Sequence, residues 1–166
     1  MKIRFFPILL LIIFLAGCGK SPEAANQSWT WDIQINQVEV QQTLQTTEIS
    51  TLYNGEKSEI EHENTPAAGN VFLILDLEVK KTGDSSQIFE WENILVMDAE
   101  GSSYQRHEND SFIEQHDYNP RMTGLPIRIG ENQGWACFEI PQKAANGKLY
   151  LVHNTSEGQN KIEIKK

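Results

Sequence analysis

The strongest constraint on the fold of this chain is a series of short runs in which apolar and polar residues alternate. In the clearest run, Val71–Val79, every second residue is aliphatic, and Phe72 and Ile74 place further apolar side chains on the opposite face. Alternation with a period of two is typical of a β-strand, and apolar residues on both faces indicate a strand in the centre of a sheet. No apolar stripe with helical spacing runs for a useful length after residue 29. The pattern therefore predicts an all-β domain.

Comparable runs occur along the rest of the chain, and residues that favour turns separate them. The expected strands cover residues 29–40, 48–53, 57–63, 71–79, 94–97, 135–140, 148–152 and 161–166, with a turn at 130–134. About seven to nine strands at this spacing predict an antiparallel β-sandwich. In the run 135–140, Phe138 is expected to point into the inter-sheet core and Glu139 to point away from it.

The first run, residues 29–40, moves its apolar residues from one face to the other near Asn36-Gln37. Before this point the apolar residues are at odd-numbered positions, and after it they are at even-numbered ones. Such a change within one strand predicts a β-bulge. It is also typical of a first strand that crosses between the two sheets of a sandwich, which we expect here.

Residues 41–69 are polar and acidic, and apolar residues alternate only weakly among them. The pair Asn54-Gly55 is typical of a hairpin turn, so residues 48–53 and 57–63 are expected to pair as a ribbon at the edge of a sheet. Residues 66–69 are expected to form the loop that follows this ribbon.

Three segments of this β-rich region are similar to a known family. They are residues 69–79, residues 98–104, and the stretch that contains Gly130-Glu131, Gly134 and Phe138–Pro141. Together they resemble the telokin-like, immunoglobulin-fold lipoprotein domain called domain of unknown function 4352, over residues 30–165. The resemblance implies an antiparallel immunoglobulin-like β-sandwich outside the cell, and it implies neither a reaction nor functional residues. The chain departs from the family's pattern at Lys81, where Asn is typical, and in its long acidic segment.

Residues 1–18 have the features of a bacterial lipoprotein signal peptide. Lys2 and Arg4 form a positive segment, and the 11 residues Phe5–Leu15 form an apolar stretch that is too short to span a membrane. The residues Leu15-Ala16-Gly17-Cys18 closely resemble the bacterial lipobox. That resemblance implies cleavage after Gly17, attachment of diacylglycerol to Cys18, and often acylation of the new amino terminus. The alternative is an ordinary secretory signal that ends beside a cysteine by chance.

We therefore expect three parts, which are a signal peptide at 1–17, a lipidated tether at 18–28 and a β-sandwich domain at 29–166. Residues 19–28 are small and polar, as is typical of a flexible tether. Ten such residues reach at most about 35 Å. The domain is thus expected to lie close to a cell membrane or outer membrane, on the side that faces away from the cytoplasm.

The acidic composition limits the partners of the domain. The chain has a net charge of −9, and cleavage would remove Lys2 and Arg4 and leave 12 basic against 23 acidic residues, a net charge of −11. An acidic surface is repelled by phosphate backbones and by anionic lipid headgroups. We therefore expect no nucleic-acid partner, and we expect lipid on Cys18, rather than charge, to hold the protein at the membrane.

Cysteine and tryptophan side chains are candidates for chemistry or for contacts. Cys137 lies in an apolar run and is expected to be a packed thiol rather than a reactive one, so the domain is expected to lack a disulfide. The tryptophans are Trp29, Trp31, Trp91 and Trp135. At least two of them are expected to fill the inter-sheet core. The alternative is that exposed tryptophans stack on sugars or anchor a partner protein.

The irregular stretch 106–117 holds the densest group of imidazoles and carboxylates. These residues are His107, Glu108, Asp110, Glu114, His116 and Asp117. Such side chains can bind a divalent ion, but their spacing matches neither a helical zinc motif nor a calcium loop. We therefore expect a solvated polar loop without a metal, in which the histidines can be replaced at little cost in stability.

The sequence also lacks the usual signatures of catalysis. It has no nucleophile elbow, no Ser-x-x-Lys motif and no phosphate-binding glycine loop. We therefore expect no enzyme activity and no cofactor. The first hypothesis is a non-catalytic binding or scaffold module of the cell envelope, whose partner is an envelope protein or a small ligand. The alternatives are a metal-dependent or hydrolytic enzyme that uses residues 106–117, and a purely structural envelope protein.

Overall fold

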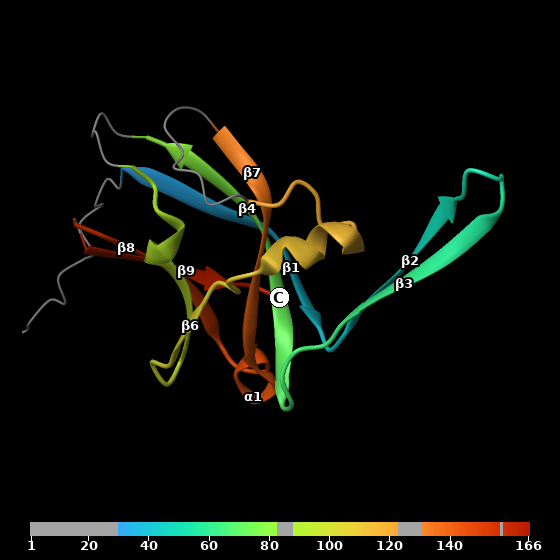
Figure 1. Ribbon diagram of the computed structural model, residues 1–166. Coiled ribbons are helices and arrows are strands. Elements are labelled where there is room, and N and C mark those ends of the chain that lie inside the picture. Colours follow the sequence, from blue (N-terminus) through green and yellow to red (C-terminus); the bar gives the residue numbers. More distant parts are fainter. Residues whose placement is uncertain (1–29, 83–87, 123–130, 157) are drawn as a thin grey trace, which may run out of the picture.

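Two antiparallel sheets form the body of the protein in the computed structural model, which describes residues 30–82, 88–122, 131–156 and 158–166 (Figure 1). The first sheet has the order β1 (Trp31–Gln41), β4 (Asn70–Lys81) and β7 (Glu131–Pro141). The second has the order β6 (Ser103–Gln105), β5 (Ile94–Asp98), β8 (Leu149–Thr155) and β9 (Gly158–Ile164). Short helices connect some of them, namely η1 (Trp91–Asn93), η2 (Asp110–His116) and α1 (Gln142–Ala145).

The order of the strands is that of an immunoglobulin-like sandwich. In that fold, strands A, B and E lie in one sheet and strands C, F and G lie in the other, to which some members add C′. Here β1, β4 and β7 take the positions of A, B and E, and β6, β5, β8 and β9 take those of C′, C, F and G. The expected fold class is therefore confirmed, and the pair β2–β3 is an insertion between the first two strands of the first sheet.

The central position of β4 is also confirmed, because this strand pairs with β1 on one side and with β7 on the other. Its residues Leu73, Leu75 and Leu77 are fully buried and share one apolar cluster with Phe138 of β7. The same cluster includes residues of β5, β8 and β9, so it lies between the two sheets. On the opposite face of β4, Phe72 and Ile74 belong to a second, smaller cluster.

The predicted bulge in β1 is confirmed, since the register with β4 shifts between Ile35 and Gln37. The expected crossing between sheets is wrong, because β1 pairs with β4 along its whole length, from Trp31 to Gln41. The bulge itself explains the change of parity. One extra residue turns the strand, so that Ile35 before the bulge and Val38 after it both pack against the inter-sheet cluster.

The turn expected at residues 130–134 is also wrong from Glu131 onward, because β7 begins there and pairs with β4 from Lys80 to Asn70. Gly134 is small for a different reason. A Cβ atom built on it would lie 2.6 Å from the carbonyl oxygen of Pro120, which accepts a hydrogen bond from the amide of Trp135. Glycine therefore allows the backbone of residues 120–122 to approach β7 closely.

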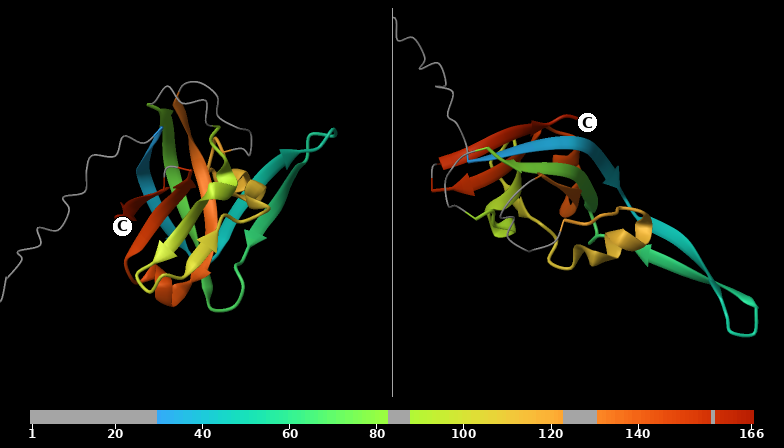
Figure 2. Two further views of the ribbon diagram at one scale, coloured as in Figure 1. Left: turned by 90° about the vertical axis from the view of Figure 1, so that its left-hand side faces the viewer. Right: turned by 90° about the horizontal axis from the view of Figure 1, so that it is seen from above.

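The predicted hairpin consists of β2 (Leu44–Thr51) and β3 (Lys57–Asn64), which pair in one antiparallel register. Gly55 has a φ of 86° in the connecting turn, as the Asn54-Gly55 pair led us to expect. The hairpin is not an edge ribbon, however, because it forms a separate two-stranded sheet. It extends away from the sandwich, as both views in Figure 2 show.

The signal peptide, the tether, Cys18 and Trp29 lie outside the described residues. Within the described part of the chain, no helix has the length and apolar character needed to cross a membrane. The proposed cleavage and lipidation therefore stay predictions from the sequence.

Candidate functional site

The stretch 106–117 is not the solvated loop that its composition led us to expect. Its second half forms η2, which lies over the outer face of the first sheet (Figure 1). Ile113 of η2 is fully buried and shares an apolar cluster with Phe72, Ile74 and Cys137 of the sheet. The expectation failed because Phe72 and Ile74 require an apolar cover, and an irregular segment with no regular apolar spacing provides it.

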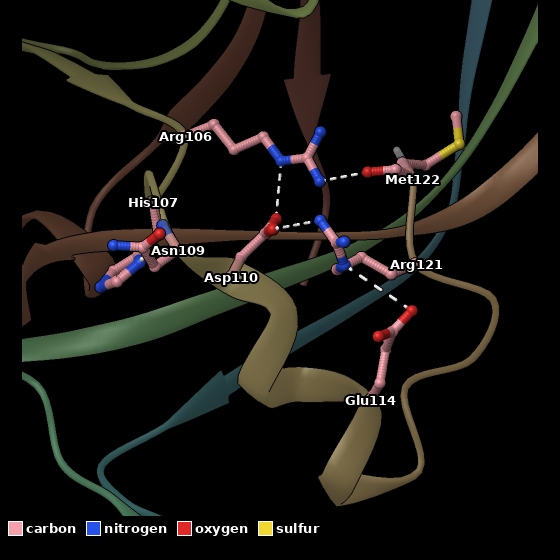
Figure 3. Close-up of polar contacts among 7 residues, drawn as sticks. All are labelled: Arg106, His107, Asn109, Asp110, Glu114, Arg121 and Met122. Carbon is pink, nitrogen blue, oxygen red and sulfur yellow. Dashed lines mark hydrogen bonds and ion pairs between the residues drawn. The ribbon is translucent and has the colours of Figure 1, made fainter. Parts of the chain in front are cut away.

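A buried carboxylate holds this segment in place. Asp110 is 2% exposed, and its Oδ2 and Oδ1 atoms lie 2.6 Å from Arg106 Nε and 2.9 Å from Arg121 Nη1 (Figure 3). Arg106 Nη2 also donates a hydrogen bond to the carbonyl oxygen of Met122. Because both oxygens of Asp110 are paired with guanidinium groups, the segments on either side of η2 are tied together.

The same two arginines are fixed against the edge of β7. Arg106 and Arg121 each form an isolated β-bridge, to Phe138 and to Trp135 respectively. The amide of His107 donates a hydrogen bond to the carbonyl oxygen of Cys137 over 2.8 Å. The network around Asp110 therefore joins η2 to the sandwich.

A pocket of about 370 Å³ opens beside this network and is lined in part by Trp91, Arg106, His107 and Asp110. The guanidinium carbon of Arg106 lies 5.0 Å from the centroid of the Trp91 ring, which is a cation–π contact. Both arginines line this pocket, and the guanidinium group of each is paired with the carboxylate of Asp110. The arrangement is that of a structural ion-pair network.

The imidazoles of the predicted cluster lie apart from each other. His107 packs edge-on against Phe72 and Phe112, whereas His116 contacts the hairpin. Among the described residues, no group of three or more His, Cys, Asp or Glu side chains is arranged to hold a metal ion. The geometry thus offers no support for the hypothesis of a metal-dependent enzyme.

His116 connects η2 to both strands of the hairpin. Its Nδ1 atom lies 2.7 Å from the hydroxyl oxygen of Thr46 in β2, and its Nε2 atom lies 3.0 Å from Oδ1 of Asn64 in β3. Burial, together with the nearby His62, lowers the pKa of His116 below its ordinary value. A neutral imidazole suits this position, because Nε2–H can donate to Asn64 while Nδ1 accepts from Thr46.

Two further contacts support the base of the hairpin. Leu44 is buried in the same apolar cluster as Ile113 and Tyr118. The hydroxyl of Tyr118 donates a hydrogen bond to Glu39 Oε2 over 2.7 Å, and burial raises the pKa of this tyrosine. The residues Glu39, Leu44, Ile113, His116 and Tyr118 are called the hairpin mount below.

Beyond the mount, the hairpin exposes apolar side chains. The exposed fractions are 62% for Ile49, 48% for Leu52 and 43% for Ile60, and Tyr53 is fully exposed. Among the described residues, only Val40 and Ile88 are also large, apolar and exposed. Concentration of exposed apolar residues on one element is a feature of interaction sites.

The predictions of a packed thiol at Cys137 and of at least two tryptophans in the core are confirmed. Cys137 is fully buried, and burial raises the pKa of its thiol, so it is a packing residue. Trp31 and Trp91 both lie in the inter-sheet cluster, while Trp135 packs against Tyr118 with 4.9 Å between ring centroids. The exposed apolar residues of the hairpin were not among the residues predicted to be functional. These residues could have been recognised in the sequence, because they are apolar residues in a polar segment that lacks the alternation of a half-buried strand.

Comparisons with known proteins support the fold and leave the function open. No family model and no curated protein matches the sequence. A conserved hypothetical protein from Bacillus anthracis is similar in structure, with a TM-score of 0.51 and 16% identity over 84% of this chain and 91% of that chain. A protein from Bacillus subtilis, described as a candidate lipoprotein, has a TM-score of 0.50 and 12% identity over 82% of this chain. That match covers 36% of the Bacillus subtilis protein.

A third solved structure is an uncharacterized β-sandwich protein from Clostridium difficile, with a TM-score of 0.42 and 16% identity over 83% of this chain and 87% of that chain. The structural neighbours are thus bacterial proteins of uncharacterised function, and at these identities the likeness concerns the fold alone.

Proposed function

We propose that this protein is a lipid-anchored, non-catalytic binding module of the bacterial cell envelope, and that its β2–β3 hairpin contacts an envelope partner protein. The observation that carries the proposal is the contrast within the hairpin. Its base is held by buried contacts, whereas Ile49, Leu52 and Tyr53 near its end are exposed. Exposed apolar side chains that gather on one projecting element are typical of an interaction site.

The proposed location, at a membrane of the cell envelope, rests on the sequence. Lys2, Arg4, the apolar stretch and the lipobox before Cys18 are the parts of a lipoprotein signal. The Bacillus subtilis neighbour is described as a candidate lipoprotein, which agrees with this location. Membership of the family of domain of unknown function 4352 is part of the same proposal, because that family combines a lipobox with an immunoglobulin-like sandwich.

The proposal of a binding function, rather than a catalytic one, is supported by the pocket beside the Asp110 network. Three of the side chains that line it are engaged with each other, since Arg106 contacts both Asp110 and Trp91. The buried thiol of Cys137, with its raised pKa, is unsuited to act as a nucleophile.

The location is tested by the variant Cys18→Ala. Fractionation of cells is expected to find the wild-type protein with the membranes, and the variant either released or left uncleaved, because lipid attachment requires the thiol. A variant that stays bound to membranes and is still trimmed normally would refute the lipid anchor.

The binding function is tested by photo-cross-linking in intact cells. Replacing Tyr53 by p-benzoylphenylalanine places the reactive group at the end of the hairpin. The matched control carries the same group at Ile88, which is also exposed and apolar but lines a pocket beside Trp31 at the start of β1. We expect a discrete adduct from position 53 that is absent from position 88. Equal adducts, or none, would contradict the proposal.

A further inference from the structure

One edge of β3 is unpaired. In the described part of the chain, the backbone of β3 pairs only with β2, in a register that runs from Leu44–Asn64 to Thr51–Lys57. An edge strand leaves about half of its N–H and C=O groups facing outward, and these groups can pair with another extended chain. The free edge of β3 is therefore a template for a third strand.

The side chains along this edge have a regular pattern of charge. Glu59, Glu61 and Glu63 share one face of β3 and follow Lys57 at its start. Their neighbours across the hairpin are Ile49, Thr47 and Gln45. Every residue on this face is exposed. None of the three carboxylates forms an ion pair within the described residues. Successive carboxylates lie about 7 Å apart, which is the repeat of a β-strand.

The opposite face of β3 carries no row of carboxylates. It carries Ser58, Ile60 and His62, and Ile60 is 43% exposed. A strand that adds to this edge would place alternate side chains next to the carboxylates on one face and next to Ile60 on the other.

We propose that the free edge of β3 binds an extended, cationic segment of a partner protein, in which Lys or Arg alternates with uncharged residues. This inference rests on the proposed function, since it names the chemistry of the partner that contacts the hairpin. Main-chain hydrogen bonds to β3 hold the segment, and its basic side chains lie beside Glu59, Glu61 and Glu63. Opposite charges on neighbouring strands attract, which selects this partner over neutral or acidic segments.

A second copy of this chain fits the edge of β3 poorly. Antiparallel pairing of two β3 strands would bring carboxylates of both copies together, and the chain as a whole has a net charge of −9. An anionic membrane surface is disfavoured for the same reason. Pairing of two copies through the edge of β2, a strand in which Glu48 is the one carboxylate, is an outcome that the experiment distinguishes.

The test measures binding of a fluorescent peptide to the full lipidated protein in nanodiscs of phosphatidylcholine. The probe is a capped peptide of four Lys-Thr repeats, which has high strand propensity. The reference probe has four Lys-Pro repeats, which carry the same charge but cannot form a strand ladder. We expect the Lys-Thr peptide to bind at least about tenfold more tightly than the Lys-Pro peptide.

Two triple variants of equal charge distinguish binding to the carboxylates of β3 from attraction to the overall negative charge of the protein. The first is Glu59→Gln, Glu61→Gln and Glu63→Gln. The second, Asp32→Asn, Glu92→Gln and Glu163→Gln, removes three exposed carboxylates outside the hairpin. We expect the first to weaken binding of the Lys-Thr peptide by about tenfold or more and the second by less than about threefold. The thermal midpoint of each variant, measured in parallel, checks that both remain folded.

Equal losses in the two triple variants, or equal binding of the two peptides, would overturn the proposal in favour of unspecific charge attraction. A dimer that forms with rising protein concentration while the Lys-Thr peptide fails to bind would overturn it in favour of a second copy. The cross-linked adduct from position 53 shows whether a failure concerns this inference alone or the proposed function as well. If the adduct forms and survives the first triple variant unchanged, the hairpin still contacts a partner but not through the acidic edge.

Discussion

The inter-sheet core and the β2–β3 hairpin differ in how they are held. The core combines residues of both sheets, and side chains such as Leu73, Phe138 and Leu151 are fully buried in it. In the hairpin, by contrast, Leu44 is the one residue of β2 and β3 that is buried. The hairpin therefore owes its position to the few contacts of its mount. This difference predicts that stability and the proposed partner contact can be altered separately in this protein.

The largest expected effect is that of Phe138→Ala in the core. Phe138 is fully buried between the sheets, so its truncation is expected to leave a cavity and to lower the free energy of unfolding by about 3–5 kcal/mol. Chemical denaturation measures this loss. A loss below about 1 kcal/mol would mean that the core does not depend on this side chain.

The neighbouring variant Glu139→Ala is a control with an intermediate expected effect on stability. The side chain points away from the core, as its parity led us to expect, but its Oε1 atom accepts hydrogen bonds from Asn70 Nδ2 over 2.7 Å and from the amide of Ala67 over 3.0 Å. Its loss is therefore expected to cost about 1 kcal/mol rather than nothing.

Asp110→Asn is expected to have the next largest effect, because it leaves two arginines without their shared carboxylate. The side chains of Arg106 and Arg121 keep some access to water, so we expect a loss of about 2–4 kcal/mol, near the lower end for a broken buried pair. Glu114→Gln is the control. Glu114 is largely exposed and lies 3.6 Å from Arg121 Nε, so its replacement should change stability by less than about 0.5 kcal/mol.

His116→Ala is expected to loosen the hairpin rather than the core. The variant removes the hydrogen bonds to Thr46 and Asn64, and we expect a cost of about 1–3 kcal/mol. Amide hydrogen exchange should become faster in β2 and β3 and stay unchanged in β4. His62→Ala, which removes the contact with Glu48 and leaves the two hydrogen-bond partners of His116 in place, is the control. Equal exchange in wild type and variant would show that the mount does not depend on this imidazole.

Acidification is expected to destabilise the protein through two buried imidazoles. Burial lowers the pKa of His116, and it lowers the pKa of His153 to about 4. Both groups are neutral in the folded protein, whereas an unfolded chain takes up their protons near pH 6.5. Stability is therefore fully present above about pH 6.5 and is lost as the pH falls towards 4. Denaturation curves for wild type and His153→Leu test this, since the variant should lose less stability over that range.

The smallest effect on stability is expected for the exposed residues of the hairpin. Ile49→Ser and Tyr53→Ser are expected to change the free energy of unfolding by less than about 0.5 kcal/mol. Of these, Ile49→Ser is also expected to reduce the adduct from a cross-linker at position 53, whereas Ile88→Ser should not. A large loss of stability in either hairpin variant would contradict the comparison between hairpin and core.

Several features of the fold could be predicted because they depend on residues that are near each other in the sequence. The alternation of Val71–Val79 predicted the central strand, Asn54-Gly55 predicted the hairpin turn, and the change of parity near Asn36 predicted the bulge. The inward position of Phe138 followed from the same two-residue period. A strand's periodicity is local, so it can be read without knowing the strand's neighbours.

The contacts of the hairpin mount were decided by the tertiary structure alone. His116 meets Thr46 and Asn64 across 70 and 52 residues of sequence, and no local pattern records such a pairing. The role of Asp110 was hidden in the same way, because the sequence showed a group of charges but not which of them would be buried. The sequence by itself predicted most of the strands and the packed thiol of Cys137, and the lipid anchor at Cys18 stays a prediction from it. Only the folded chain decided which polar residues hold the hairpin, since burial of a charge depends on the partners that the fold brings to it.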